Sequence, residues 1–351
     1  MEYPPSSTGR HGTFPERLYK LLLLAYPRNF REEYGSEMLR VYRDAYRDTS
    51  YWQGVPGVLR LWADFFYDFV KTVCIEHVKS WSGESRLALS GKEQLAMTLH
   101  YTLDIAQRTD IGRKRENNED NLISIVPDDD QLLQARGALF VVSDGMGGHD
   151  LGEVASELTI KHVKESYYQN LQDDIPTALQ KAIKQANTFI LQDMEAKQSA
   201  GVSSKRMGAT CVAAVLHEQT LYVANIGDSR VYVLHQGQLR QVTRDHSLVS
   251  QMVERGEITA AEARTHESRN VIYRSLGQPE VEVDLFVESV MPGDSIILCT
   301  DGLCGVLEDE DLRTIVEQYG PDESVQRLIA RANEEGGPDN VTAIVVRVAA
   351  A

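Results

Sequence analysis

Cysteine is scarce in this chain, which has 351 residues and only four cysteines: Cys74, Cys211, Cys299 and Cys304. No two of them form a Cys-x-x-Cys pair, and their spacing does not match that of a zinc site. The sequence therefore indicates neither a disulfide framework nor a structural zinc ion. A chain without disulfides fits a reducing compartment, so we expect a cytoplasmic protein.

Long apolar runs are also lacking near the start of the chain. The longest one there extends from Leu21 to Ala25 and is followed by Tyr26 and Pro27. A signal-peptide core needs about 7–15 apolar residues, and a membrane-spanning helix needs about 20. The run is too short for either.

An excess of basic residues is missing as well, because 36 lysines and arginines stand against 52 aspartates and glutamates, for a formal net charge of −16. Nonspecific binding to nucleic acid needs clustered lysine and arginine, which displace the counterions of the phosphates. We therefore expect no nucleic-acid partner. The same charge repels a phosphate dianion, so chemistry on phosphate would need a local cation such as a bound metal ion.

The residues that are present divide the chain into two parts. The sequence is 42% hydrophobic and 25% charged, which is typical of a soluble globular protein. Within residues 1–85, apolar side chains recur at the three- and four-residue steps of amphipathic helices. They include Phe30, Tyr34, Met38, Val41, Tyr42, Trp62, Phe65, Phe66, Phe69 and Val73. We predict a small all-α module over residues 1–85, a polar linker over residues 86–97 and a larger domain over residues 98–351.

The larger domain alternates short β-branched segments with pairs of helical segments. The expected strands are residues 98–106, 122–126, 138–143, 210–216, 221–226, 231–234, 281–287, 295–299 and 341–348. The expected helices are residues 152–168, about 176–194, 309–318 and 322–333. Many strands with helices inserted in pairs predict an α+β fold, a four-layer sandwich of two antiparallel β-sheets flanked by helix pairs.

Acidic residues stand where several of these strands begin or end. Asp144-Gly145 and Asp301-Gly302 each follow a strand, and Asp339 precedes the last strand. Carboxylates are hard oxygen ligands, and strand ends hold them in place, so together they could surround a divalent ion. The main-chain carbonyl of Gly145 is a further candidate ligand. The alternative for any one Asp-Gly pair is an ordinary turn, because both residues are common in turns.

Two further segments carry candidate residues. Glu119 and Asp120 follow a basic stretch that includes Arg115. The two carboxylates could serve a metal ion and its water, and the guanidinium of Arg115 matches phosphate oxygens in geometry. A solvated charged loop is the alternative. Asp228 lies between two expected strands, where we predict a tight hairpin turn, and metal binding would be an additional role.

Five motifs in this order resemble the metal-dependent protein phosphatase family, the type 2C phosphatases, and in particular its bacterial branch. They are Thr109-Asp-x-Gly-x-x-Arg-x-x-Asn-Glu-Asp120, Asp144-Gly-Met-Gly-Gly-His149, Gly227-Asp-Ser-Arg230, Thr300-Asp-Gly302 and Gly337-Pro-Asp-Asn340. The resemblance extends from about residue 98 to the C-terminus. It implies a hydrolase for phosphoserine and phosphothreonine on proteins, with two Mn²⁺ or Mg²⁺ ions in a cleft at one end of the sandwich.

The resemblance also assigns roles to the candidate metal ligands. Asp144 would bridge both ions. Asp301 and Asp339 would complete one site, and Glu119 and the Gly145 carbonyl would complete the other. A metal-free mechanism with a cysteine nucleophile is not indicated, since no Cys-x5-Arg loop is present.

Catalytic roles follow from the same resemblance. Asp120 would orient metal-bound water for in-line attack on phosphorus, and Arg115 would neutralise the phosphoryl oxygens. Many eukaryotic relatives have a histidine at the position of Met146, the usual candidate for protonating the leaving group. Here either His149 or a metal-bound water would do so, and a packing role for His149 is equally open.

Two more segments bear on metal and substrate. Gly305 stands where some relatives have an aspartate that helps to hold a third ion, which puts a third ion in doubt. Asp228 then either contributes to metal binding or only stabilises its turn. Residues 245–277 correspond to the flap beside the family's cleft, which is expected to tune substrate choice.

The expected partners are proteins that carry phosphoserine or phosphothreonine, including, by family analogy, a bacterial serine/threonine kinase and its substrates. Residues 18–38 are similar to a small helical prefix of bacterial permease subunits, so residues 1–85 could dock the enzyme to a protein or membrane complex. Helices that pack only for their own stability are the alternative. A second class of function is a catalytically silent regulator that binds phosphoproteins, although no carboxylate of the set is lost.

Overall fold

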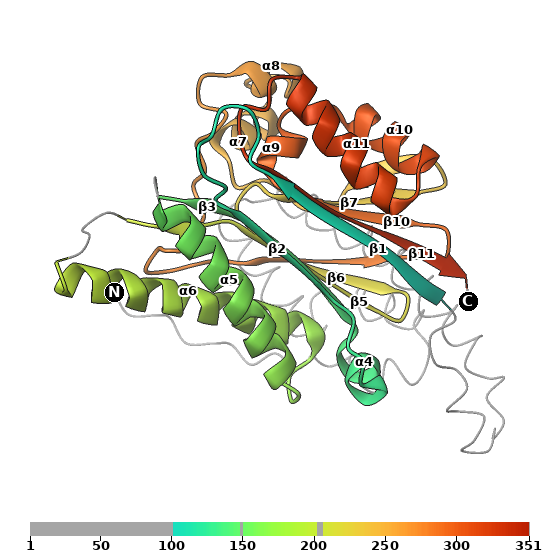
Figure 1. The fold of residues 1–351 in the computed structure, drawn as a ribbon, viewed down its shortest axis with the longest axis horizontal. Helices are drawn as coiled ribbons and strands as arrows, with labels where there is room; N and C mark the ends of the chain where they lie inside the picture. Colours follow the sequence, from blue (N-terminus) through green and yellow to red (C-terminus); the bar gives the residue numbers. More distant parts are fainter. Residues whose placement is uncertain (1–100, 148–149, 202–205, 351) are drawn as a thin grey trace, which may run out of the picture. The chain divides into compact units, whose positions relative to one another are not determined.

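The computed structural model describes residues 101–147, 150–201 and 206–350, which lie in the second of the two units of the chain, Met97–Ala351 (Figure 1). The helical module predicted over residues 1–85 and the linker predicted over residues 86–97 lie outside the described residues and stay predictions. No helix in the described part of the chain is long and apolar enough to cross a membrane.

Two antiparallel sheets form the centre of this unit. The strands of the first sheet lie in the order β1 (Tyr101–Asp110), β11 (Val341–Ala350), β10 (Ser295–Cys299), β7 (Arg230–His235) and β8 (Gln238–Gln241). Those of the second sheet lie in the order β2 (Asp120–Ile125), β3 (Ala138–Met146), β5 (Cys211–His217), β6 (Thr220–Ile226) and β9 (Asp284–Ser289), with β4 (Gly208–Ala209) paired to β3. Because β1 pairs with β11, the first and last described segments lie together.

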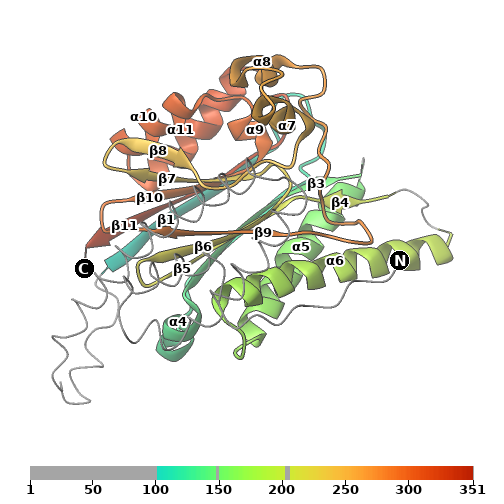
Figure 2. The same cartoon turned by 180° about the vertical axis from the view of Figure 1, so that it is seen from behind.

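Helices cover the outer face of each sheet, which gives four layers (Figures 1 and 2). The helices are α5 (Asp150–Gln169) and α6 (Ile175–Ser199) on the second sheet, and α9 (Asp301–Cys304), α10 (Asp309–Gln318) and α11 (Pro321–Glu334) on the first. Tyr167 of α5 and Leu312 of α10 are buried in the two cores between a helix layer and its sheet. Phe140 of β3 is buried in the core between the two sheets. The predicted four-layer sandwich is confirmed.

The helix bounds follow from capping residues. Asp174 precedes α6, and its carboxylate accepts a hydrogen bond of 2.9 Å from the backbone N–H of Thr177. Pro176 occupies the first turn of α6, and Pro321 occupies the first turn of α11, where a missing N–H costs nothing. These signals place the predicted starts of both helices within one residue of the observed ones.

Two predicted strands are displaced, and several short elements are not predicted. β1 continues to Asp110 instead of ending at residue 106. β9 begins at Asp284 instead of residue 281, and its apolar Leu285 and Val287 are 39% and 57% exposed, whereas Phe286 packs between the sheets. The sequence pattern does not predict β4, β8 or four helices, because all six are too short to show a period. These helices are α9, α4 (Asp130–Arg136), α7 (Leu248–Glu254) and α8 (Ala260–Thr265).

The prediction of a tight hairpin around Asp228 is wrong. The flanking strands belong to different sheets: β6 pairs with β5 and β9, and β7 pairs with β10 and β8. The chain instead crosses from one sheet to the other here. Gly227 has a φ of +114°, and a Cβ on it would lie 2.6 Å from the side chain of Thr210. Only glycine fits this crossing without strain.

Candidate metal centre

Acidic residues from both sheets meet at one end of the sandwich. The pairing of β2 with β3 places Asp120 opposite Asp144. In the first sheet, Asp301 follows β10 and Asp339 precedes β11, and these two strands are neighbours. Asp228, at the crossing between the sheets, lies near enough to raise the pKa of Asp144. We call these five residues the acidic cluster.

Asp120 ties the two sheets together through hydroxyl groups. Its side chain is buried, and its Oδ2 accepts hydrogen bonds from Thr300 Oγ1 at 2.9 Å and Thr342 Oγ1 at 2.6 Å. The backbone N–H of Thr342 donates in turn to Thr300 Oγ1 at 3.1 Å. Asp120 Oδ1 has no hydrogen-bond partner among the described residues. One carboxylate oxygen is therefore fixed, and the other is left for a group that the protein does not supply.

The acidic cluster holds negative charge at a high electrostatic cost. Burial raises the pKa of Asp120 to about 7, with Asp301 and Asp339 adding to the shift and the two threonine hydroxyls opposing it. Burial also raises the pKa of Asp144 well above its usual value, and Asp120 and Asp301 raise it further. The pKa of Asp301 is raised by burial and by Asp339. A cation placed among these groups would relieve the repulsion and keep them ionised.

Arg115 reaches the acidic cluster from the loop between β1 and β2. Its Nη2 donates to Asp339 Oδ2 at 2.7 Å, and its side chain is 48% exposed. The hydrogen bond to Asp339 raises the pKa of Arg115, and Asp144 and Glu119 contribute to the same shift. The guanidinium thus lies at the solvent side of the acidic cluster, where it can meet an incoming anion.

Asn340 holds the loop that carries Arg115 and Glu119. The side chain of Asn340 is 5% exposed. Its Nδ2 donates to the carbonyls of Ile111 and Asn117, both at 2.9 Å, and its Oδ1 accepts from the backbone N–H of Glu119 at 2.8 Å. One amide therefore connects the start and the end of this loop to the segment just before β11.

Glu119 and Gly145 lie side by side at the edge of the acidic cluster. The N–H of Gly145 donates to the carbonyl oxygen of Glu119 at 3.1 Å. A Cβ on Gly152, in the first turn of α5, would lie 2.5 Å from the carboxylate of Glu119. Glycine at position 152 therefore lets that carboxylate lie against the helix.

The segment that carries Asp228 is held from two sides. Arg230 donates to both carboxylate oxygens of Asp245 at 2.7–3.0 Å, a pair that is mostly buried. The N–H of Gly227 donates to Nδ1 of the buried His246 at 3.0 Å. Burial raises the pKa of Asp228 well above its usual value, and Asp301 adds to the shift, so Asp228 belongs electrostatically to the acidic cluster.

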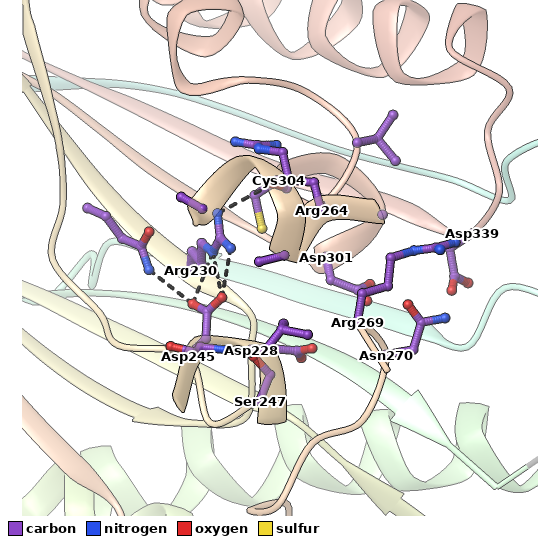
Figure 3. Close-up of a pocket in the computed structure, with 18 of the residues that line it drawn as sticks. Asp228, Arg230, Asp245, Ser247, Arg264, Arg269, Asn270, Asp301, Cys304 and Asp339 are labelled. Carbon is purple, nitrogen blue, oxygen red and sulfur yellow. Dashed lines mark hydrogen bonds and ion pairs between the residues drawn. The ribbon is translucent and has the colours of Figure 1, made fainter. Parts of the chain in front are cut away.

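A cavity of about 570 Å³ opens from the acidic cluster. Arg115, Asp228, Asp301 and Asp339 line one end of it, and residues of α7 and α8 line the other. Figure 3 shows Asp301 and Asp339 on one side of this cavity and the pair of Arg230 with Asp245 on another. The opening is large enough for a phosphorylated side chain with part of its flanking chain.

The donor set fits a hard divalent cation, because it consists of carboxylate oxygens. Asp120 Oδ1 and Asp301 Oδ1 are buried without a hydrogen-bond partner among the described residues. In their present positions, no described group of three or more histidine, cysteine, aspartate or glutamate side chains could hold an ion. Metal binding would require side chains of the acidic cluster to turn towards a shared position.

The structure brings together eight of the nine candidate residues taken from the sequence, and His149 lies outside the described residues. Three further residues support the acidic cluster although the sequence alone assigns them no role: Thr300, Thr342 and Asn340. Thr300 and Asn340 belong to two of the five motifs and are adjacent to Asp301 and Asp339, which is the signal that could have found them. Thr342 looks like an ordinary strand residue.

The comparisons with known proteins agree with this geometry. Residues 119–344 match the family model described as protein phosphatase 2C. The serine/threonine phosphatase stp of Listeria monocytogenes is 36% identical over 245 residues, which are 68% of this chain and 93% of the relative. The serine/threonine protein phosphatase PstP of Mycobacterium tuberculosis is 36% identical over 255 residues, 73% of this chain and 46% of the relative.

Solved structures show the same architecture. The crystal structure of the M. tuberculosis serine/threonine phosphatase PstP/Ppp has a TM-score of 0.62 at 35% identity, and the match covers 70% of this chain and 99% of that one. The PstP catalytic domain in complex with two manganese ions has a TM-score of 0.61 at 35% identity, covering 71% of this chain and 99% of that one. The motifs, the fold and these relatives agree, and the chain belongs to the protein phosphatase 2C family.

Proposed function

We propose that this chain is a metal-dependent phosphatase that hydrolyses phosphoserine and phosphothreonine esters on proteins. The observation that carries the proposal is the convergence of the acidic cluster from two sheets beside Arg115. The similarity to chains named serine/threonine phosphatase supports the same substrate class.

The residues of the site would hold two Mn²⁺ or Mg²⁺ ions. Asp144, Asp301 and Asp339 would hold one, and Asp144 with Glu119 and the Gly145 carbonyl would hold the other. Divalent ions at such a site supply positive charge for phosphate oxygens and lower the pKa of water towards neutrality. The relative PstP supports this stoichiometry, since its catalytic domain has been solved with two manganese ions. A third ion is not part of the proposal, although Asp228 belongs to the acidic cluster.

The remaining side chains would bind and orient the reactants. Arg115 would clamp the phosphoryl oxygens, because its forked donors match them in geometry. Asp120 would accept a hydrogen bond from the attacking water through Oδ1, while two threonine hydroxyls hold Oδ2 in place. His149 remains a candidate for protonating the leaving oxygen.

The test compares Asp144→Asn with the wild-type chain. With Mn²⁺ and a phosphothreonine peptide, we expect kcat/KM to fall by about 10²–10³-fold, the usual effect of removing one group that stabilises transition-state charge. Calorimetry should show weaker Mn²⁺ binding as well. Asp322→Asn is the matched control, because Asp322 is exposed in the first turn of α11 and does not line the cavity. Equal rates for Asp144→Asn and the wild type would refute the proposal.

The cytoplasmic location, an opposing serine/threonine kinase and docking through residues 1–85 complete the proposal. The first is supported by the three free, buried cysteines among the described residues, Cys211, Cys299 and Cys304. The other two come from the sequence alone.

A further inference from the structure

The cavity beside the acidic cluster has a second end that the proposed chemistry does not use. It lies beside residues 247–272, which contain α7 and α8 and form the central part of the flap expected over residues 245–277. Below, the flap means residues 247–272. The two ends of the flap are joined by the bridge between Ser247 and Ile272 and by a hydrogen bond of 2.8 Å from Leu248 N–H to the Val271 carbonyl. The flap is thus a closed structural loop with its own wall facing the cavity.

The flap end of the cavity is lined by apolar side chains from three places in the chain. They are Val249 and Val253 of α7, Ala260 and Ala263 of α8, and Val306 just after α9. Apolar surface in a polar cavity favours an apolar occupant, because covering it removes water from both partners.

The cationic groups at this end already have partners. Arg230 is paired with Asp245, and Arg244 is paired with Glu254. Arg264 Nη1 donates to the Leu307 carbonyl at 2.7 Å, which ties α8 to the segment after α9 and fixes the width of the cavity. By contrast, Arg269 and Asn270 lie on the side of Asp301 and Asp339 (Figure 3). A second anionic group of a substrate would have to break one of these contacts, whereas an apolar side chain would break none.

We propose that the flap end of the cavity is a specificity subsite that binds one apolar side chain of the substrate protein, within three residues of the phosphorylated residue. The proposal rests on the proposed phosphatase function, since the phosphorylated residue anchors the substrate at the acidic cluster. The ligand class is thus an extended phosphopeptide with a leucine-like side chain near the phosphoserine or phosphothreonine.

The test uses the full chain with Mn²⁺ and phosphothreonine peptides in an alanine background, with leucine, glutamate or phosphoserine placed in turn at each of three positions on either side. We expect leucine at one position to raise kcat/KM about tenfold over alanine, because a few methylene groups in an apolar pocket give discrimination of about 10–200-fold. Ala263→Leu should fill the subsite and remove this preference. Val253→Ala should enlarge it and shift the preference towards phenylalanine.

The matched control is Ala261→Leu, which makes the same change on the same helix at an exposed residue that does not line the cavity. It should leave the preference intact. Para-nitrophenyl phosphate has no flanking residues, so the ratio of kcat/KM for the leucine peptide to kcat/KM for this ester reports peptide discrimination alone. This ratio should fall in Ala263→Leu and keep its wild-type value in Ala261→Leu. If the wild type hydrolyses this ester but prefers leucine at no peptide position, the subsite proposal is wrong and the phosphatase function stands. The same holds if the wild type prefers glutamate or phosphoserine to leucine. Absence of turnover of every substrate would instead overturn the phosphatase function.

Discussion

Replacement of Asn340 tests whether the metal centre depends on the loop that one buried amide holds. Asn340 makes three hydrogen bonds of 2.8–2.9 Å to the backbone of Ile111, Asn117 and Glu119. In Asn340→Ala, all three backbone groups lose their partner. A typical hydrogen bond contributes about 1 kcal/mol, so we expect the free energy of unfolding to fall by about 3 kcal/mol.

Asn340→Asp keeps the size and shape of the side chain but removes its ability to donate hydrogen bonds. The carboxylate can still accept from the Glu119 N–H, but its other oxygen faces two carbonyl oxygens and cannot donate when ionised. Two of the three hydrogen bonds are lost, and a negative charge is added next to Asp339. We expect a loss of stability at least as large as in Asn340→Ala, because repulsion from the two carbonyl oxygens and from Asp339 adds to the loss of about 2 kcal/mol from the hydrogen bonds.

The assays are urea unfolding and calorimetric titration with Mn²⁺. Because Glu119 and Arg115 lie on the held loop, both variants should bind Mn²⁺ more weakly than the wild type. Asn170→Ala is the matched control, since Asn170 also makes three hydrogen bonds, to Asp173 and Gln172, but in the connection between α5 and α6. It should lose stability without any change in Mn²⁺ affinity. If Asn340→Ala kept the wild-type stability and Mn²⁺ affinity, the hydrogen bonds of Asn340 would not hold the loop that carries Arg115 and Glu119 in place for metal binding.

Two further predictions concern single side chains. Thr342→Val removes the hydroxyl that donates to Asp120 Oδ2 at 2.6 Å and that also pairs with Thr109 Oγ1 at 2.7 Å. The hydrogen bond to the charged Asp120 is worth about 1.5–3 kcal/mol, so kcat at saturating Mn²⁺ should fall at least about tenfold. Thr188→Val, at an exposed residue, should leave kcat unchanged, and an equal fall of kcat in both variants would refute the role of Thr342. Burial lowers the pKa of His246 from 6.5 although Asp284 opposes this, so His246 favours folding above pH 6.5 and loses that contribution as the pH falls through its folded pKa. Urea unfolding should show stability falling below pH 6.5 more steeply in the wild type than in His246→Gln, and identical pH dependence in both would contradict this.

The fold follows closely from local sequence patterns where elements are long. The helices starting near Pro176 and Pro321 and the strands before Asp144 and Asp301 all carry a period or a capping residue that acts within a few positions. β8 and the flap helices α7 and α8 are too short to show a period. Ser247 caps α7, and Thr259 forms a capping box with Glu262 at the start of α8, but a cap without a following periodic segment does not by itself predict a helix. The crossing at Gly227 shows the same limit. Two strands joined by a short turn have the same sequence pattern whether they pair with each other or enter different sheets.

The candidate ligands could be predicted one by one, but their support could not. Asp144 and Asp301 stand at strand ends, a position visible in the sequence. The hydrogen bonds from Thr300 and Thr342 to Asp120 join the first sheet to the second, and only the stacking of the sheets brings these groups together. The sequence also does not predict that apolar side chains of the flap line a cavity, because small apolar residues on a short helix usually indicate packing.

Asp339 connects metal binding to phosphate binding at this site. Its Oδ2 accepts from Arg115 at 2.7 Å and its Oδ1 accepts from the backbone N–H of Asn340 at 2.8 Å, so both oxygens have protein partners. If Asp339 is a metal ligand, a cation competes with Arg115 for the same carboxylate, and a phosphate group competes with Asp339 for Arg115. Each event therefore frees the group that the other needs, and by linkage each must raise the affinity for the other equally. A protein with a net charge of −16 therefore binds a phosphate dianion more tightly when a cation occupies the same site, and it binds the cation more tightly when the phosphate is present.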